Sequence, residues 1–123
     1  TLEQALAHSV NVIAIRVLIK TGVTAVTEFF TRMGLRARVP HNLSLALGSL
    51  ETSPMEVAGA MGIFANNGRY DRPFLIRQIT TANNKVIFRH TPRLRQVIKK
   101  TVARTVHGYM RAVTTYGTGR ALA

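Results

Sequence analysis

The chain has 123 residues and a formal net charge of +12, from 17 Lys and Arg against five Asp and Glu. This length suits one domain or part of one, and a hydrophobic content of 46% excludes a disordered chain. The lack of cysteine excludes a disulfide framework and a thiolate metal site. No stretch is typical of a signal peptide or a membrane span, because the longest apolar run, residues 12–19, is far too short and contains Arg16. The positive charge favours an anionic partner, either nucleic acid, phospholipid headgroups or an acidic polymer.

A capping box opens the chain, with Thr1 as the N-cap and Gln4 reaching back to it, and predicts a short helix to about His8. Directly after this helix, Ser9 and Asn11 place a hydroxyl and a carboxamide two residues apart between two apolar runs. A hydroxyl can relay a proton and an amide can hold a peptide group, so the pair suits a catalytic cleft. The alternative is structural: Ser9 ends one helix and Asn11 caps the next, as both residue types commonly do.

Two further helices are predicted next. Periodicity alone fits residues 12–19 to a buried strand or a buried helix. Lys20 would suit the negative end of a helix dipole and Gly22 would stop a helix in the left-handed conformation, so a helix is favoured. Apolar side chains then recur at helical spacing until Gly34 ends the pattern. The face expected to turn inward comprises Val23, Val26, Phe29, Phe30 and Met33.

The middle of the chain contains a connection and one strongly signalled helix. Residues 35–47 are the predicted connection. After it, Ser53 offers a hydroxyl N-cap, Pro54 suits the first helical position, and Glu56 supplies a carboxylate at the third. The helix that they open is expected to end at Asn67-Gly68 and to bury Val57, Ala58, Met61, Phe64 and Ala65, with Met55 also in the core.

The last part of the chain predicts a hairpin and a helix. Residues 74–80 and 86–88 are predicted strands joined through residues 82–85, where asparagine tolerates the positive φ of a tight turn. The last helix, capped by Thr101 and running to about Thr115, is expected to turn inward Val102, Val106, Tyr109, Met110 and Val113 before residues 117–120 close it. A lone hairpin is marginal in water, so the expected fold class is α+β: a mostly helical fragment with one β-hairpin, excerpted from a larger domain.

Four stretches carry a family resemblance. They are residues 5–16 around Ser9-Val10-Asn11, then Leu47-Gly48-Ser49 with residues 52–58, then residues 64–68, and last Gly117-Thr118-Gly119-Arg120. Together these stretches resemble the transpeptidase domain of penicillin-binding proteins, most closely the bifunctional class A type. They cover essentially the whole chain in the family's order and approximate spacing. Each stretch alone is a weak signal, and four in register are a strong one.

The family uses three motifs in chain order: Ser-x-x-Lys with the nucleophile, then Ser-x-Asn, then Lys-Thr-Gly on a strand beside the cleft. Ser9-Val10-Asn11 matches the second motif, and neither of the others is found at its expected place. The resemblance therefore implies that residues 1–123 are a partial domain of the penicillin-binding-protein and serine β-lactamase-like fold, inactive when isolated. Lys20-Thr21-Gly22 spells the third motif, but nine residues after Asn11 a helix end with a glycine stop is the better interpretation.

The reaction that the resemblance implies is serine acyl transfer by a D,D-transpeptidase. Such enzymes cross-link peptidoglycan stem peptides and are the targets of β-lactams. Carried over to this chain, Ser9 would help pass a proton toward the leaving amine. Asn11 would bond the amide of the substrate and help orient the lysine of the first motif. The implied location is the outer face of the bacterial cytoplasmic membrane, or the periplasm, with any membrane anchor outside this segment; no cofactor and no nucleic acid are implied.

Other functions stay open at this point. Residues 89–100 and the net charge favour a small cationic nucleic-acid-binding module, although no reader motif is present. Within the family, a D,D-carboxypeptidase or a serine β-lactamase shares the Ser-x-Asn logic. Residues 117–120 lack the lysine of a phosphate-binding loop and fit a helix stop and turn better. A metal site is disfavoured because the four histidines lack ligand spacing; they are His8, His41, His90 and His107.

Overall fold

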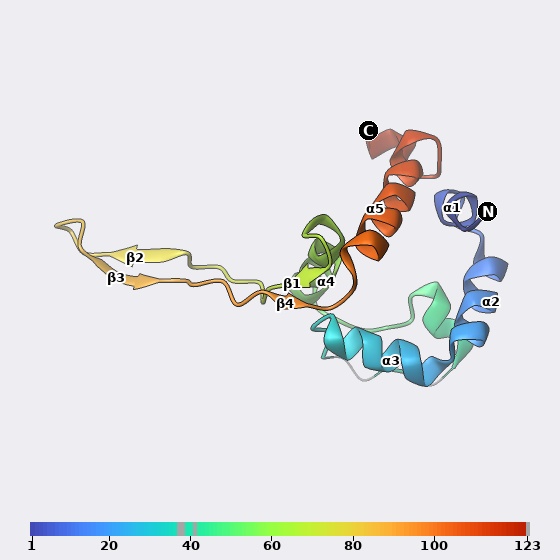
Figure 1. Cartoon of the computed structure of the whole chain (residues 1–123), viewed down its shortest axis with the longest axis horizontal. Helices are drawn as coiled ribbons and strands as arrows, with labels where there is room; N and C mark the ends of the chain where they lie inside the picture. Colours follow the sequence, from blue (N-terminus) through green and yellow to red (C-terminus); the bar gives the residue numbers. More distant parts are fainter. Residues whose placement is uncertain (37–38, 41, 123) are drawn as a thin grey trace.

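The computed structural model describes residues 1–36, 39–40 and 42–122, so His41 lies outside the described residues. Helices account for most of the described elements, as the sequence predicts (Figure 1). In chain order the elements are α1 (Leu2–Ala7), α2 (Asn11–Thr21), α3 (Val23–Arg32), the 3-10 helix η1 (Leu43–Leu47), α4 (Pro54–Ala65), β1 (Arg69–Tyr70), β2 (Gln78–Thr80), β3 (Val86–Arg89), β4 (Arg95–Gln96), α5 (Lys100–Thr115) and the 3-10 helix η2 (Arg120–Leu122).

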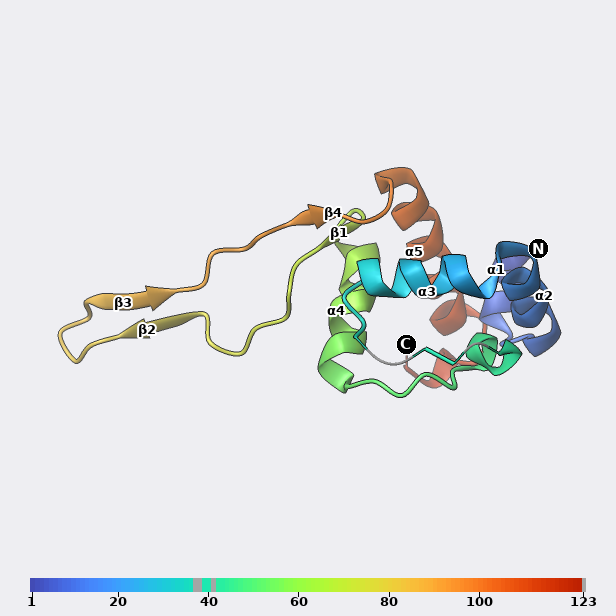
Figure 2. The ribbon, with the colours of Figure 1, turned by 90° about the horizontal axis from the view of Figure 1, so that it is seen from below.

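The helices form a body from which a long hairpin arm projects (Figures 1 and 2). Within the body, α1 packs along α5, α2 contacts η1, and α4 contacts α5. The first helix of the chain therefore meets the last one, although more than ninety residues separate them in the sequence. This contact brings the Ser9-Val10-Asn11 segment beside the C-terminal turn.

A small apolar core joins α3, α4 and the segment after β4. Its buried members are Met33, Ala60, Ile63 and Val97, with Phe29, Phe30, Leu35, Phe64, Tyr70 and Ile98 packed against them. Ile63 is completely buried, and Met33 is 4% exposed. The predicted inward face of α3 is therefore confirmed, because each of its five apolar residues is buried or half-buried. Burial of this face holds α3 against the rest of the body.

Side-chain caps fix the starts of α1 and α4 as predicted. Thr1 accepts a hydrogen bond from the Gln4 N–H at 3.2 Å, and the Gln4 side chain reaches back to complete the box. Ser53 accepts from the Glu56 N–H at 3.2 Å, and Pro54 occupies the first helical position. These boxes satisfy backbone donors that lack partners inside the helix. Local sequence therefore determines where both helices begin.

The hairpin arm, residues 71–93, is longer than the sequence indicates. Strands β2 and β3 pair antiparallel with Ile79 opposite Phe88, and Asn84 in the turn has a φ of 59°, as predicted. Residues 74–77 are not strand, so the first predicted strand is too long. A second two-stranded ladder, β1 with β4, closes the base of the arm and was not predicted. It escapes prediction because each of its strands has only two residues.

Several local predictions are wrong, and each error has a physical reason. Helix α4 buries Ala60 and Ile63, whereas Met55, Val57 and Met61 are 39–47% exposed. This helix is apolar nearly all round, so periodicity did not set which face packs. The N-cap of α5 is Lys99 rather than Thr101, and Val102 is exposed. The predicted connection 35–47 contains η1, and Gly22 has φ 88° and ψ 137°, a positive φ outside the left-handed helical region.

Candidate active site

The Ser9-Val10-Asn11 segment forms a tight turn between α1 and α2. Ser9 has a φ of 53°, an uncommon value for a residue other than glycine, and the Val10 N–H donates to the Ala5 carbonyl at 2.9 Å. Val10 is the N-cap of α2 without a side-chain capping bond, and Asn11 is the first helical residue. The alternative in which Asn11 caps this helix is therefore wrong. Its carboxamide is exposed, as is the Ser9 hydroxyl.

The turn after α5 holds the Ser9 segment from the other side. Thr118 donates its backbone N–H to the Ala7 carbonyl at 2.9 Å, and its hydroxyl lies 3.5 Å from the same oxygen. The Thr118 and Ser9 hydroxyl oxygens are 3.1 Å apart, and either can be the donor. Gly117 packs so closely on Ala7 that a side-chain carbon would overlap the Ala7 carbonyl. The Gly-Thr-Gly sequence is therefore a docking turn for the end of α1.

A second contact ties the same two helices together one turn away. The Tyr116 hydroxyl donates to Oε1 of Glu3 at 2.8 Å, and the rings of Tyr116 and His8 lie 6.0 Å apart. The hydrogen bond to the Glu3 carboxylate raises the pKa of the Tyr116 phenol above its ordinary value. Both contacts place α1, and with it Ser9, relative to the C-terminal turn.

Thr118 is the site residue that sequence reasoning did not assign. The sequence of its segment predicts a helix stop and turn, and its partner, Ser9, lies 109 residues earlier in the chain. The only signal available was its place between two glycines, which allows the backbone to approach another element closely. Lys20-Thr21-Gly22, by contrast, lies at the end of α2 as predicted, far from any strand in sequence.

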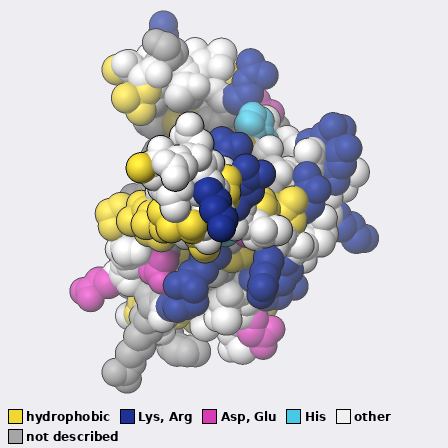
Figure 3. Space-filling view, turned by 90° about the vertical axis from the view of Figure 1, so that its left-hand side faces the viewer, with side chains coloured by type: hydrophobic (Ala, Val, Ile, Leu, Met, Phe, Trp, Pro, Cys, Tyr) yellow, Lys and Arg dark blue, Asp and Glu magenta, His cyan; other side chains and the backbone are white. Residues whose placement is uncertain are grey.

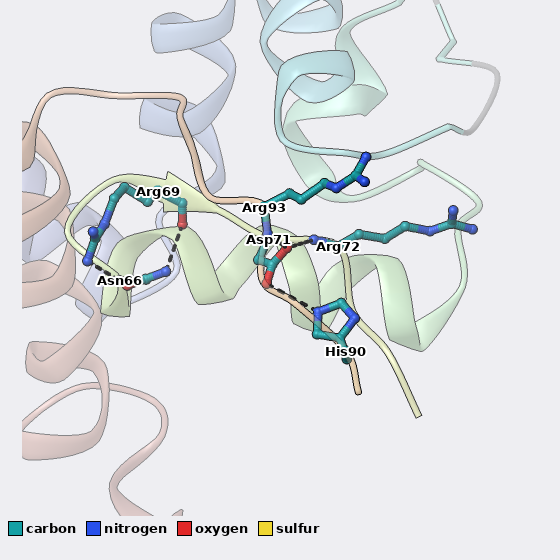
Figure 4. A network of polar contacts seen from close by, with 6 residues as sticks. All are labelled: Asn66, Arg69, Asp71, Arg72, His90 and Arg93. Atoms are coloured by element: carbon teal, nitrogen blue, oxygen red, sulfur yellow. Dashed lines mark hydrogen bonds and ion pairs between the residues drawn. The ribbon is translucent and has the colours of Figure 1, made fainter. Parts of the chain in front are cut away.

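Another polar cluster lies at the base of the hairpin arm (Figure 4). Asp71 accepts backbone hydrogen bonds from Arg72 at 3.0 Å and Arg93 at 3.2 Å, and its other oxygen faces Nε2 of His90 at 3.7 Å. Phe74 stacks on the His90 ring at 3.7 Å. Asp71 thus joins both strands where the arm leaves the body. Asp71, Arg72 and Phe74 border a hollow of about 350 Å³ that is also lined by residues of α4.

Positive charge concentrates on the arm and its base. Residues 69–100 carry nine Lys and Arg side chains and one acid, Asp71. Figure 3, which looks toward the left-hand side of Figure 1, shows Lys and Arg gathered beside exposed hydrophobic side chains. Ser9 lies in the turn after α1 and Asn11 begins α2, and four hollows of the described residues are lined by other side chains. Their catalytic assignment stays a prediction.

The residues that the structure describes offer no group of three or more His, Asp or Glu side chains arranged to hold a metal ion. In the same residues, no helix is both long enough and apolar enough to cross a bilayer. Ser9, Asn11 and Thr118 bring hydroxyl and amide groups to this turn, and such groups can relay protons and form hydrogen bonds. These are the groups that hold a peptide bond during acyl transfer.

Comparison with known proteins identifies the class to which this fold and turn correspond. The family described as the penicillin binding protein transpeptidase domain matches residues 1–123. Penicillin-binding protein 1A of Aquifex aeolicus is 38% identical over 120 residues, which are 98% of this chain and 16% of that protein. Penicillin-binding protein 1A of Pseudomonas aeruginosa is 38% identical over 92 residues, 74% of this chain and 11% of that protein. The chain belongs to the penicillin-binding protein transpeptidase domain family.

Solved structures share the fold. Penicillin-binding protein 1A from Haemophilus influenzae superposes with a TM-score of 0.90 at 23% identity, covering 100% of this chain and 24% of that one. Penicillin-binding protein 3 of Mycobacterium tuberculosis, in complex with aztreonam, gives 0.88 at 19% identity, covering 100% and 34%. The expected fold class, a mostly helical part of a transpeptidase domain, is therefore confirmed. These relatives give no support to the nucleic-acid-binding interpretation.

Proposed function

We propose that residues 1–123 form the central part of the transpeptidase domain of a D,D-transpeptidase that cross-links peptidoglycan stem peptides and reacts with β-lactams. The observation that carries the proposal is the Ser-x-Asn turn, found in a chain whose whole length matches the family. Ser9 and Asn11 are exposed, and the Ser9 hydroxyl lies 3.1 Å from the hydroxyl of Thr118, whose backbone bonds to the end of α1. The proposed location, also taken from the family, is the outer face of the cytoplasmic membrane.

In the proposed reaction, a serine outside these residues attacks the peptide bond between two D-alanines. No serine of this chain is followed by a lysine three residues later, so the nucleophile comes from elsewhere in the domain. The lysine of the first motif takes the proton of the attacking serine, and the Ser9 hydroxyl receives a proton from that lysine as it gives its own to the leaving amine nitrogen. The C–N bond breaks, an acyl-serine ester forms, and D-alanine departs. Asn11 holds the amide of the substrate through its carboxamide.

The test is acylation by a fluorescent penicillin in the full-length protein that carries this chain. We expect Ser9→Ala to lower the second-order acylation rate by about 10²–10⁴-fold, the usual contribution of a positioned proton relay. Asn11→Ala should also slow acylation, because the substrate amide loses a partner. The matched controls are Thr105→Val and Asn83→Ala, which remove a hydroxyl and a carboxamide from exposed positions on α5 and the hairpin turn. Wild-type rates in Ser9→Ala and Asn11→Ala would contradict the proposal.

Two further measurements define the reaction class. The isolated 123-residue chain should show no mass increase after incubation with a penicillin, because it contains no Ser-x-x-Lys sequence. A covalent adduct would contradict the assignment of the nucleophile. Product analysis with a stem peptide and an amine acceptor then separates the related activities. Release of D-alanine with formation of a cross-linked dimer supports a transpeptidase. Release without a dimer indicates a carboxypeptidase, and hydrolysis of the drug indicates a β-lactamase.

A further inference from the structure

The Thr118 hydroxyl is held in a defined direction by the end of α1. Ala7 is the last residue of that helix, so its carbonyl has no partner inside the helix, and the residue is fully buried. The backbone N–H of Thr118 donates a hydrogen bond to this carbonyl at 2.9 Å, and the Thr118 hydroxyl lies 3.5 Å from the same oxygen. The backbone and the side chain of Thr118 are thus anchored to one buried group.

This anchored hydroxyl is a hydrogen-bonding partner of Ser9 at 3.1 Å. A hydroxyl has one hydrogen and two lone pairs, so Thr118 can accept from Ser9 while its hydrogen points to the Ala7 carbonyl, or turn that hydrogen to donate to Ser9. Ser9 itself stands at a positive φ of 53°, which its own backbone does not favour. The Thr118 hydroxyl lies within hydrogen-bond distance of the Ser9 oxygen and restrains where that oxygen points.

We infer that Thr118 is a positioning residue for Ser9: its hydroxyl fixes the Ser9 oxygen and remains a partner whichever way the Ser9 hydrogen points. A proton relay alternates between giving and receiving a proton, and a partner that can do both keeps the oxygen in place throughout. Valine has the shape of threonine without this capacity, whereas serine keeps the hydroxyl. The inference rests on the proposed function, because it assigns Thr118 a part in the Ser9 step.

The experiment measures acylation of the full-length protein by a fluorescent penicillin, resolved into drug binding and the acylation step. We expect Thr118→Val to slow the acylation step about two- to tenfold, the range of one neutral hydrogen bond, with little change in drug binding. Thr118→Ser should retain the parent acylation rate. Thr105→Val is the control for loss of a threonine hydroxyl at an exposed position on α5. Thermal unfolding of each variant reports any structural loss; if Thr118→Val does not fold, Thr118→Ala, which is smaller, replaces it.

A double-mutant comparison separates positioning from folding. In a Ser9→Ala background, Thr118→Val should have no further effect on the acylation step, because the oxygen that it positions is gone. An equal loss with and without the Ser9 hydroxyl, or a wild-type rate in Thr118→Val, would overturn the inference. A slow Ser9→Ala with a fast Thr118→Val refutes the role of Thr118 alone. A wild-type rate in Ser9→Ala refutes the proposed function itself.

Discussion

Gly117 is the position where one added carbon should separate α1 from α5. In Gly117→Ala the new carbon would lie 2.8 Å from the Ala7 carbonyl carbon and 2.9 Å from Cα of Val113, both backbone atoms. Ordinary carbon contacts begin at about 3.5 Å. The new carbon would lie closest of all to the Ala7 carbonyl oxygen, so α1 and the end of α5 must part by roughly 1 Å or more. Overpacking of this kind costs about 1–3 kcal/mol, and the weakened Thr118–Ala7 hydrogen bond adds about 0.5–1.5 kcal/mol. The stiffer unfolded chain offsets about 0.4–1 kcal/mol, leaving a net loss of about 0.5–4 kcal/mol.

Urea unfolding of the complete transpeptidase domain measures this loss, and acylation by a penicillin measures its effect on the Ser9 turn. Gly108→Ala is the control, because the added carbon meets nothing within 4 Å on an exposed part of α5. A helical glycine of this kind should gain about 0.5–1 kcal/mol on replacement by alanine. Gly117→Ala should therefore lower the free energy of unfolding, whereas Gly108→Ala should raise it. Equal stability of Gly117→Ala and the parent domain would refute the close packing of the docking turn.

Three further results are expected. Ile63→Ala should lower the free energy of unfolding by about 2–5 kcal/mol in urea unfolding, because a completely buried side chain leaves a cavity; a smaller loss than that of Ile63→Val would refute the core assignment. A hydrogen bond from the Thr52 hydroxyl lowers the pKa of the Glu56 carboxyl. The stabilisation of the fold by this bond is present above the ordinary carboxyl pKa and is lost as pH falls through the lowered pKa of Glu56. In Glu56→Gln, the free energy of unfolding should no longer fall at low pH by the part that protonation of Glu56 contributes. The same loss of stability at low pH in Glu56→Gln and in the parent would contradict this role of Glu56. Glu3→Gln should lower the pKa of Tyr116 toward that of an ordinary tyrosine, as measured by phenolate absorbance. The Tyr116–Glu3 hydrogen bond stabilises the fold below the ordinary tyrosine pKa, and this stabilisation is lost as pH rises through the raised pKa of Tyr116.

The hairpin shows how far short-range signals reach. Asparagine in the turn predicted a positive φ, and Asn84 adopts one. The length of the arm did not follow, because Phe74, Leu75 and Ile76 are apolar but lie outside the ladder. The bond from the His90 N–H to the Arg77 carbonyl is next to the end of that ladder. Asp71 at the base bonds to a backbone N–H twenty-two residues later, a contact that no local pattern encodes. Turn chemistry is local, whereas the point at which two strands separate depends on what lies at their base.

The residues of the candidate site also differ in whether the sequence alone reveals them. Ser9 and Asn11 were recognisable because their residue types and spacing match a family motif, and that recognition needs no coordinates. Thr118 was not recognisable, because its role arises from a contact with a hydroxyl 109 residues away. The rejection of Asn11 as a cap also required the backbone, which places Val10 at that position.

Sequence by itself determined the helix starts at Thr1 and Ser53, the inward face of α3, and the family, because caps and amphipathic spacing act within a few residues. Tertiary structure alone decided which side of α4 is buried, since a helix that is apolar all round has no preferred face until neighbours pack on it. It also decided that Thr118 meets Ser9, because only the packing of α1 on α5 brings the two ends of the chain together.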